Sequence, residues 1–167
     1  MKKNDESVIS CIFSKDRKTV LLIKRRDVPV WTLPGGGIED NETITEATLR
    51  EVLEETGYQS KIRKKVGEYS PINKLAKFTH LFESEIISGE PTLSDETKDI
   101  KFFDVDNLPK LPPPYKEWIH DSLKNEKTLI KKKLKSVNYL SLIKNLILHP
   151  ILVIRFLLAK IGLTINT

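Results

Sequence analysis

Short apolar runs separated by polar turns dominate the first part of the chain. Residues 8–13 and 19–23 are rich in β-branched and other apolar side chains, and a polar turn at 14–17 separates them. This alternation predicts two strands. Further strand-like runs occupy residues 77–87 and 100–105.

Two other stretches carry helical signals. From Thr43 to Thr56 apolar residues recur at helical spacing, and Gly57 follows where a C-cap glycine ends a helix. A second helix is predicted over 115–123, directly after the prolines at 112–114. Strands and helices mixed in this order indicate a layered α/β or α+β domain.

The predicted helix over 43–56 has two chemically different faces. At about 100° per residue, three carboxylates fall within an arc of about 100°: Glu51, Glu54 and Glu55. The face predicted to meet the core carries Leu49, Val52, Leu53 and Thr56. Like charges four residues apart repel each other, so this cluster favours a bound cation, with a plain solvated face as the alternative.

Three consecutive glycines, Gly35, Gly36 and Gly37, stand just before this acidic helix. Glycine is entropically costly, so the run indicates a backbone conformation or a close approach that a Cβ would block. Such a loop can bring main-chain groups to a metal ion or a phosphate; a tight turn is the alternative. The hard carboxylate oxygens suit Mg²⁺, with Mn²⁺ as an alternative ion, and the absence of clustered His or Cys argues against zinc.

The last part of the chain has a different character. Residues 126–136 are strongly basic, which we interpret as a linker or a helix, and residues 137–167 form a hydrophobic, amphipathic helical tail divided by Pro150. The tail is long enough to cross a bilayer, but Lys144 and Arg155 interrupt it. We therefore favour peripheral membrane contact, with packing on the domain, self-association through 137–167 and true insertion as alternatives.

Composition and charge narrow the class of protein. With 39% hydrophobic and 31% charged residues, the chain fits one soluble globular domain over residues 1–125, followed by the tail. Residues 122–167 hold nine Lys and Arg against one acid, a balance of +8, which leaves −3 of the total of +5 for residues 1–121. The acidic balance of the domain argues against nucleic acid as a partner. A single cysteine, Cys11, and no signal-peptide-like run predict a cytoplasmic protein.

Residues 36–58 resemble the Nudix box, Gx5Ex7REUxEExGU, in which U is a bulky aliphatic residue. Eight positions match at the required spacing: Gly36, Glu42, Arg50, Glu51, Val52, Glu54, Glu55 and Gly57. Tyr58 departs from the pattern, because an aliphatic residue is usual there. The likeness extends to residues 31–34 before the box and to Phe102-Phe103 and Leu108-Pro109 after it. The chain is therefore identified as a member of the Nudix hydrolase family.

The resemblance implies an α/β/α sandwich with a mixed sheet, here with a helical C-terminal extension. It also implies Mg²⁺-dependent hydrolysis of a diphosphate bond in a nucleotide-like small molecule. By position in the box, Glu51 and Glu55 are expected metal ligands, Glu54 a ligand or a water-mediated contact, and the carbonyl of Gly35 a backbone ligand.

The same resemblance assigns supporting roles. Arg50 would orient the carboxylates, with a simple surface pair to Glu54 as the alternative, and Glu42 would brace the arrangement from the start of the helix. The general base in this family is a box glutamate, for which Glu54 is the candidate, or an acid from a later loop. Glu96 is our candidate for the loop acid, as base or supplementary ligand; a hairpin turn residue is the alternative.

Substrate contacts are less defined by the sequence. Arg25 or Arg26 could bind phosphates through paired hydrogen bonds, but adjacent strand residues face opposite sides, so we expect one at most to do so. The main chain at Gly36 and Gly37 offers further phosphate contacts. Nucleoside triphosphates, ADP-ribose or sugar nucleotides, and dinucleoside polyphosphates all stay open. Two other functions compete with hydrolysis of a nucleotide: a non-catalytic nucleotide sensor and a membrane-tethered enzyme for a lipid-linked diphosphate.

Overall fold

The computed structural model describes residues 5–124, 128–161 and 163. The elements follow the chain as β1 (Glu6–Ile12), β2 (Thr19–Arg25), β3 (Trp31–Thr32), α1 (Ile44–Thr56), β4 (Tyr58–Pro71), β5 (Phe78–Gly89), β6 (Thr97–Asp104), α2 (Tyr115–Leu123), β7 (Ile130–Leu134), α3 (Tyr139–Leu148) and α4 (Pro150–Lys160). The four strands and two helices predicted for the first 125 residues are confirmed, with ends shifted by a few residues.

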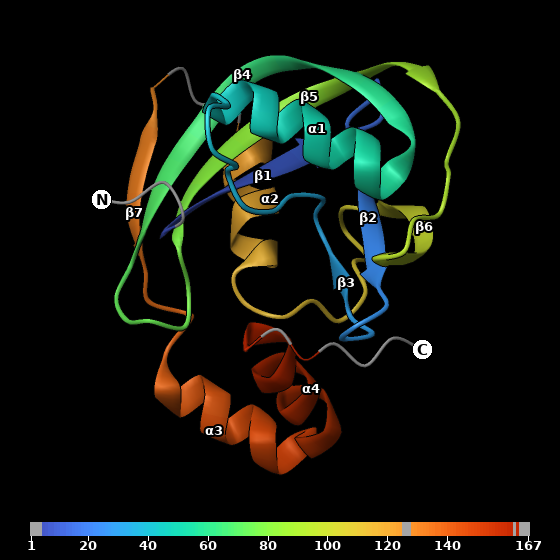
Figure 1. Cartoon of the computed structure of the whole chain (residues 1–167). Helices are drawn as coiled ribbons and strands as arrows, with labels where there is room; N and C mark the ends of the chain where they lie inside the picture. Colours follow the sequence, from blue (N-terminus) through green and yellow to red (C-terminus); the bar gives the residue numbers. More distant parts are fainter. Residues whose placement is uncertain (1–4, 125–127, 162, 164–167) are drawn as a thin grey trace.

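The strands form two sheets. Four strands make a mixed sheet in the order β1-β5-β4-β7, in which β1 runs parallel to β5 and β7 runs parallel to β4. Three strands make an antiparallel sheet in the order β3-β2-β6. The helices α1 and α2 lie on opposite sides of this β-layer, which Figure 1 shows with α1 in front of the strands and α2 behind them.

Each face of the β-layer has its own core, because successive strand side chains point to opposite sides. Ile9 and Cys11 of β1 pack in the core that contains Trp118 of α2. Ile12 points the other way and packs with Val52 of α1. Strands covered on both faces explain the nearly continuous apolar runs in the sequence, and the layering confirms the predicted α/β/α sandwich with a mixed sheet.

The helix α1 has strong local signals at both ends. The Thr43 side chain accepts a hydrogen bond from the Glu46 amide at 3.2 Å, and the Glu46 carboxylate accepts one from the Thr43 amide at 2.7 Å. This capping box satisfies amide groups that the first turn leaves unpaired. Gly57 ends the helix in the left-handed conformation with φ of 75°, and its amide donates to the Leu53 carbonyl, which confirms the predicted C-cap.

The predicted core-facing stripe of α1 is correct at Val52 and Thr56 and wrong at Leu53, and it leaves out three buried residues, Ala47, Thr48 and Glu55. Leu53 is 46% exposed, whereas Glu55 is only 4% exposed. The face against the sheet is formed by Ala47, Thr48, Val52, Glu55 and Thr56. Hydrophobicity alone predicts burial of Leu53, but in the folded chain the sheet and the glycine loop take in the Glu55 carboxylate instead.

The interpretation of residues 126–136 as a linker or a helix is wrong for residues 130–134. These residues form β7, which pairs in parallel with Gly67–Pro71 at the edge of the mixed sheet. Ile130 and Leu134 are buried, and Lys132 on the same face places its ammonium 2.7 Å from a carboxylate oxygen of Asp121. The predicted boundary at residues 125 and 126 lies outside the described residues.

The tail folds into a helical hairpin. Helices α3 and α4 meet at Pro150, which occupies the first turn of α4, where a missing amide hydrogen costs little. In Figure 1 the hairpin lies at one end of the molecule, with α4 between α3 and the rest of the fold. Among the helices that the structure describes, none combines the length and the apolarity needed to cross a bilayer.

Candidate active site

A cavity of about 490 Å³ opens beside the glycine loop of residues 35–37, which precedes α1. Its walls are the three glycines at 35–37, the α1 carboxylates Glu51, Glu54 and Glu55, the loop at 94–96, and Arg25, Glu39 and Arg50. Every residue predicted to contact metal or substrate therefore lines this cavity, with the exception of Arg26. The fold brings together groups from β2, the glycine loop, α1 and the loop before β6.

Two of the three glycines are closely approached by neighbouring atoms. Gly35 has φ of +149°, and a Cβ there would overlap the carbonyl oxygen of Val8. A Cβ on Gly36 would overlap the carboxylate of Glu51. Gly37 differs, since a Cβ there would meet nothing closer than 3.9 Å. The predicted close approach thus holds for Gly35 and Gly36, and the loop is fixed to β1 by a hydrogen bond of 2.9 Å from the Val8 amide to the Gly36 carbonyl.

Arg50 lies at the centre of a hydrogen-bond network. Its guanidinium donates to both carboxylate oxygens of Glu42, at 2.8 and 3.1 Å. It also donates to Glu51 and Glu54, both at 3.0 Å, and to the carbonyl oxygen of Gly37 at 3.0 Å. Arg50 is therefore more than a surface partner of Glu54, because it ties the glycine loop to two carboxylates of α1 while Glu42 holds its other edge.

Glu55 is the most deeply placed carboxylate of the site. Its Oε2 atom accepts a hydrogen bond of 2.8 Å from the amide of Gly35. Burial raises the pKa of Glu55 to about 8; the Gly35 hydrogen bond opposes this shift, and the charges of Glu51 and Glu96 add to it. Burial likewise raises the pKa of Glu51. The cavity therefore holds more negative charge than its own cations offset.

The donor chemistry of this site fits a hard divalent cation. Carboxylate and carbonyl oxygens are the ligands that Mg²⁺ and Mn²⁺ prefer, and a cation would offset both the burial of the Glu55 carboxylate, which is the main cause of its raised pKa, and the repulsion from Glu51 that adds to it. Within the described residues, no three His, Cys, Asp or Glu side chains are already arranged around one point as ligands. The reason is visible in the contacts, since Glu51 and Glu54 are turned toward Arg50.

The two neighbouring arginines have separate places. Arg25 lines the cavity, and its guanidinium makes a forked contact with Asp27, at 2.8 and 2.5 Å. Arg26 does not line it: its side chain donates to the Ser94 carbonyl at 3.0 Å, and its amide donates to the Glu96 carbonyl at 2.9 Å. The predicted substrate contact of Arg26 is therefore replaced by support of the loop that carries Glu96.

Sequence reasoning missed two residues that adjoin the site. Asp27 fixes the guanidinium of Arg25, and its position two residues after that arginine is the only sequence signal for the pair. Tyr115, at the start of α2, lies within electrostatic range of Arg25 and Glu55; burial raises the pKa of Tyr115, and the charge of Glu55 adds to this effect. The packing of α2 brings Tyr115 close to Arg25 and Glu55, so no local sequence pattern predicts its place beside the site.

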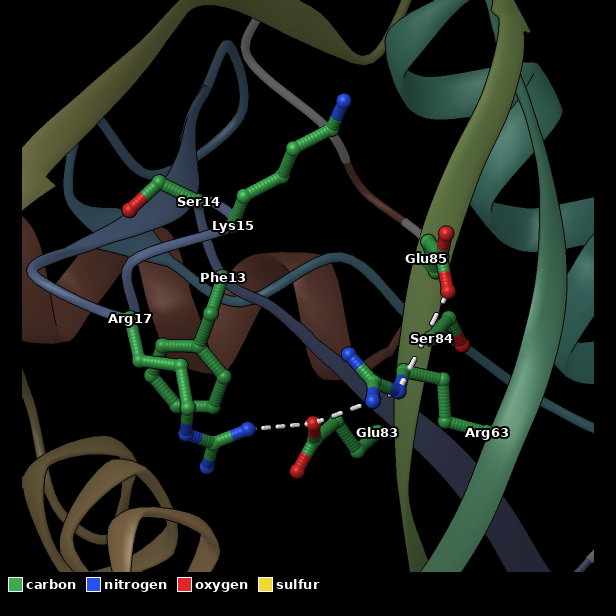
Figure 2. A pocket seen from close by; sticks show the side chains of 8 residues that line it. All are labelled: Phe13, Ser14, Lys15, Arg17, Arg63, Glu83, Ser84 and Glu85. Atoms are coloured by element: carbon green, nitrogen blue, oxygen red, sulfur yellow. Dashed lines mark hydrogen bonds and ion pairs between the residues drawn. The ribbon is translucent and has the colours of Figure 1, made fainter.

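A second, smaller hollow of about 110 Å³ is lined by Phe13, Arg17, Arg63 and Glu83, among others (Figure 2). Glu83 is 3% exposed. Its carboxylate lies 2.5 Å from Arg17, 4.0 Å from Arg63 and 3.8 Å from Lys64. Cations outnumber this acid, so the hollow lacks the negative charge that would attract a metal ion.

Comparison with known proteins agrees with this geometry. The NUDIX domain family model matches residues 3–123. An ADP-ribose pyrophosphatase of Methanocaldococcus jannaschii is 38% identical over 119 residues, covering 68% of this chain and 70% of that protein. A Bacillus subtilis protein with a provisional assignment as 8-oxo-dGTP diphosphatase is 36% identical over 115 residues, covering 68% of this chain and 76% of its own.

The fold agrees as well. The crystal structure of an ADP-ribose pyrophosphatase from Streptococcus suis superposes with a TM-score of 0.62 at 20% identity, covering 77% of this chain and 97% of that one. The chain therefore belongs to the Nudix family. It is a hydrolase of acid anhydrides, the class of bond that joins the phosphates of a diphosphate. Enzymes of this family act with divalent metal ions on small nucleotide substrates.

Proposed function

We propose that this hydrolase cleaves the diphosphate bond of a nucleoside diphosphate-linked substrate, with Mg²⁺ held by Glu51, Glu54 and Glu55 and by the carbonyl oxygen of Gly35. The observation that carries the proposal is the concentration of these carboxylates on one open cavity beside a glycine loop in which Gly35 and Gly36 leave no room for a Cβ. Mn²⁺, with the same preference for oxygen, is expected to substitute.

The bound ion would neutralise the phosphate charge and lower the pKa of the attacking water. Arg50 positions Glu51 and Glu54 through its forked contacts, and Glu42 keeps the guanidinium in place. Arg25 on the cavity wall offers guanidinium N–H groups to a phosphate. The main chain of Gly36 and Gly37 offers further polar groups at the mouth of the cavity.

Glu96 is the proposed general base. It lines the same cavity as the α1 carboxylates, in a loop held by Arg26, and near enough to Glu51 and Glu55 for their charges to interact. Glu51 and Glu54 are occupied by Arg50, whereas the Glu96 carboxylate makes no ion pair within the described part of the chain. An exposed carboxylate without a fixed partner can accept a proton from the water that attacks phosphorus.

A substrate panel with Mg²⁺ tests the reaction. The names of the two relatives motivate ADP-ribose and 8-oxo-dGTP, and a sugar nucleotide and a dinucleoside polyphosphate complete the panel. We expect hydrolysis of at least one compound, its loss on chelation of the metal, and a fall of about a thousandfold in kcat for Glu54→Gln. Tight binding of a nucleotide without any hydrolysis would instead establish a sensor.

A pair of neighbouring variants tests the base. Glu96→Gln should lower kcat and abolish the acidic limb of the pH–rate profile, because the amide cannot accept a proton. Asp95→Asn is the matched control, since Asp95 lines the same wall and carries the same charge. Equal effects of the two substitutions would assign the loop a merely electrostatic role.

A further inference from the structure

The helical hairpin of α3 and α4 exposes an unusual amount of apolar surface. The most exposed side chains are Leu140 at 77%, Ile147 at 76%, Ile151 at 72% and Ile161 at 71%. Single exposed aliphatic residues are common on proteins, but a cluster of this kind on two adjacent helices marks an interaction surface.

One side of this hairpin is already committed to the domain. Val153 of α4 is buried, and the guanidinium of Arg155 donates to the Asp27 carbonyl at 2.7 Å and to the Arg26 carbonyl at 3.3 Å. The Asn73 side chain donates to the Val137 carbonyl at 2.8 Å, just before α3 begins. The domain holds the hairpin from one side, so the exposed side chains of the other side are accessible to a partner outside this fold.

The charge next to the apolar surface indicates which kind of partner this surface binds. Lys131, Lys133 and Lys135 are exposed on and just after β7, which leads into α3, and Lys144 is exposed on α3 itself. The sequence contains no acid after Glu126. Two copies of this surface would bring like charges together, whereas an anionic lipid surface offers both the opposite charge and an apolar layer.

The dimensions of the hairpin fit a lipid surface. Helices of 10 and 11 residues are about 15 and 17 Å long, roughly half the hydrocarbon thickness of a bilayer. We propose that the α3–α4 hairpin lies flat on an anionic phospholipid surface. Its outer aliphatic side chains enter the acyl boundary, and the lysines of the β7 region contact lipid phosphates.

Vesicle co-sedimentation of the full chain tests this proposal. The chain should pellet with vesicles that contain phosphatidylglycerol and remain in solution with phosphatidylcholine alone. The variant Leu140→Gln/Ile147→Gln/Ile151→Gln should bind more weakly by about a tenfold factor for each aliphatic side chain that enters the acyl boundary, about a thousandfold for all three. Ile87→Gln is the matched control, because Ile87 is 56% exposed on β5 of the domain, and this variant should bind normally.

A second pair of measurements tests the contact between the lysines and the lipid phosphates, and tests whether a second copy of the chain binds this surface instead. Lys133→Gln/Lys135→Gln changes exposed residues only, and should weaken vesicle binding about fivefold for each lysine and reduce its salt dependence. Sedimentation velocity should give a monomer for the full chain and for the triple variant. A dimer that the triple substitution dissolves, or equal binding to both vesicle types, would overturn the proposal.

Discussion

Two buried glutamates, Glu55 and Glu83, show how the same side chain is used in opposite ways. Both are almost inaccessible, at 4% and 3% exposure. Glu83 is surrounded by Arg17, Arg63 and Lys64, and the hollow beside it is the one in Figure 2. Glu55 receives a single amide hydrogen bond and is repelled by Glu51 and Glu96.

The two glutamates differ in the source of the positive charge that neutralises them. At Glu83 the chain provides its own cations, so the carboxylate contributes to the fold. Around Glu55, Arg50 is shared among Glu42, Glu51 and Glu54, and Arg25, whose charge acts on Glu55, is paired with Asp27. A buried carboxylate without enough counter-charge is costly, and such a deficit of positive charge indicates a place for an external cation.

The largest expected effect compares the two glutamates directly. Glu55→Gln should lower kcat/KM about a thousandfold by removing a metal ligand. Glu83→Gln should leave kcat/KM within about threefold, but lower the free energy of unfolding by about 1–3 kcal/mol, because Arg17 loses its charged partner. Steady-state kinetics at saturating Mg²⁺ and urea unfolding measure the two quantities. A similar loss of activity in both variants would remove the distinction.

The arginines at the two sites provide the next contrast. Lysine cannot reproduce the forked contacts of Arg50 with Glu42, Glu51 and Glu54, so Arg50→Lys should lower kcat/KM about a hundredfold and raise the Mg²⁺ concentration needed for half-maximal rate. Arg17→Lys preserves one charge beside Glu83 and should change neither. A metal titration of the rate distinguishes positioning of the ligands from a loss of stability, which urea unfolding reports separately.

The third prediction concerns pH in the absence of metal. Glu55 has its pKa raised from 4.5 to about 8 in the fold, so the folded chain binds its proton more tightly than the unfolded chain does. The contribution to stability is therefore complete below pH 4.5 and is lost as the pH rises through about 8. The free energy of unfolding of the metal-free protein should fall by up to about 5 kcal/mol relative to Glu55→Gln across this window, at about 1.4 kcal/mol for each pH unit. Saturating Mg²⁺ should abolish the difference, and a parallel pH dependence of the two proteins would contradict it.

The smallest effect is expected at the glycine loop. A Cβ on Gly36 meets the end of the flexible Glu51 side chain rather than backbone, so Gly36→Ala should displace that carboxylate and lower kcat/KM about tenfold with little change in stability. Gly37→Ala meets open space and should be neutral. Kinetics and thermal unfolding of this pair would show whether the close approach serves the site or the fold, and equal losses of activity would contradict the assignment.

Local signals in the sequence are sufficient to predict α1 and its place in the site. Thr43, Glu46 and Gly57 fix the ends of the helix through contacts within a few residues, and the box spacing assigns the carboxylates to one face. The burial of Glu55 is not predictable in this way, because it depends on the amide of Gly35, twenty residues away in the chain.

The strands β4 and β7 show where local patterns fail. Tyr58–Pro71 contains a run of basic residues with few apolar ones, and its pairing with β5, not its composition, makes it a strand. In β7 three lysines separate Ile130 from Leu134, a spacing that also suits a helix. Pairing with the edge of β4, burial of Ile130 and Leu134, and the carboxylate of Asp121 make the extended form favourable. The supporting role of Arg26 was likewise unpredictable, since Ser94 lies far along the chain.

The contact between the tail and the domain is unusual in being directed at the main chain. Arg155 donates to the carbonyl oxygens of Arg26 and Asp27, and those oxygens are present whatever side chains stand at the two positions. The β2–β3 loop can therefore vary in sequence without losing its hold on α4. For this pair of hydrogen bonds the requirement falls on Arg155, because a lysine ammonium has no planar fork with which to reach two successive carbonyls.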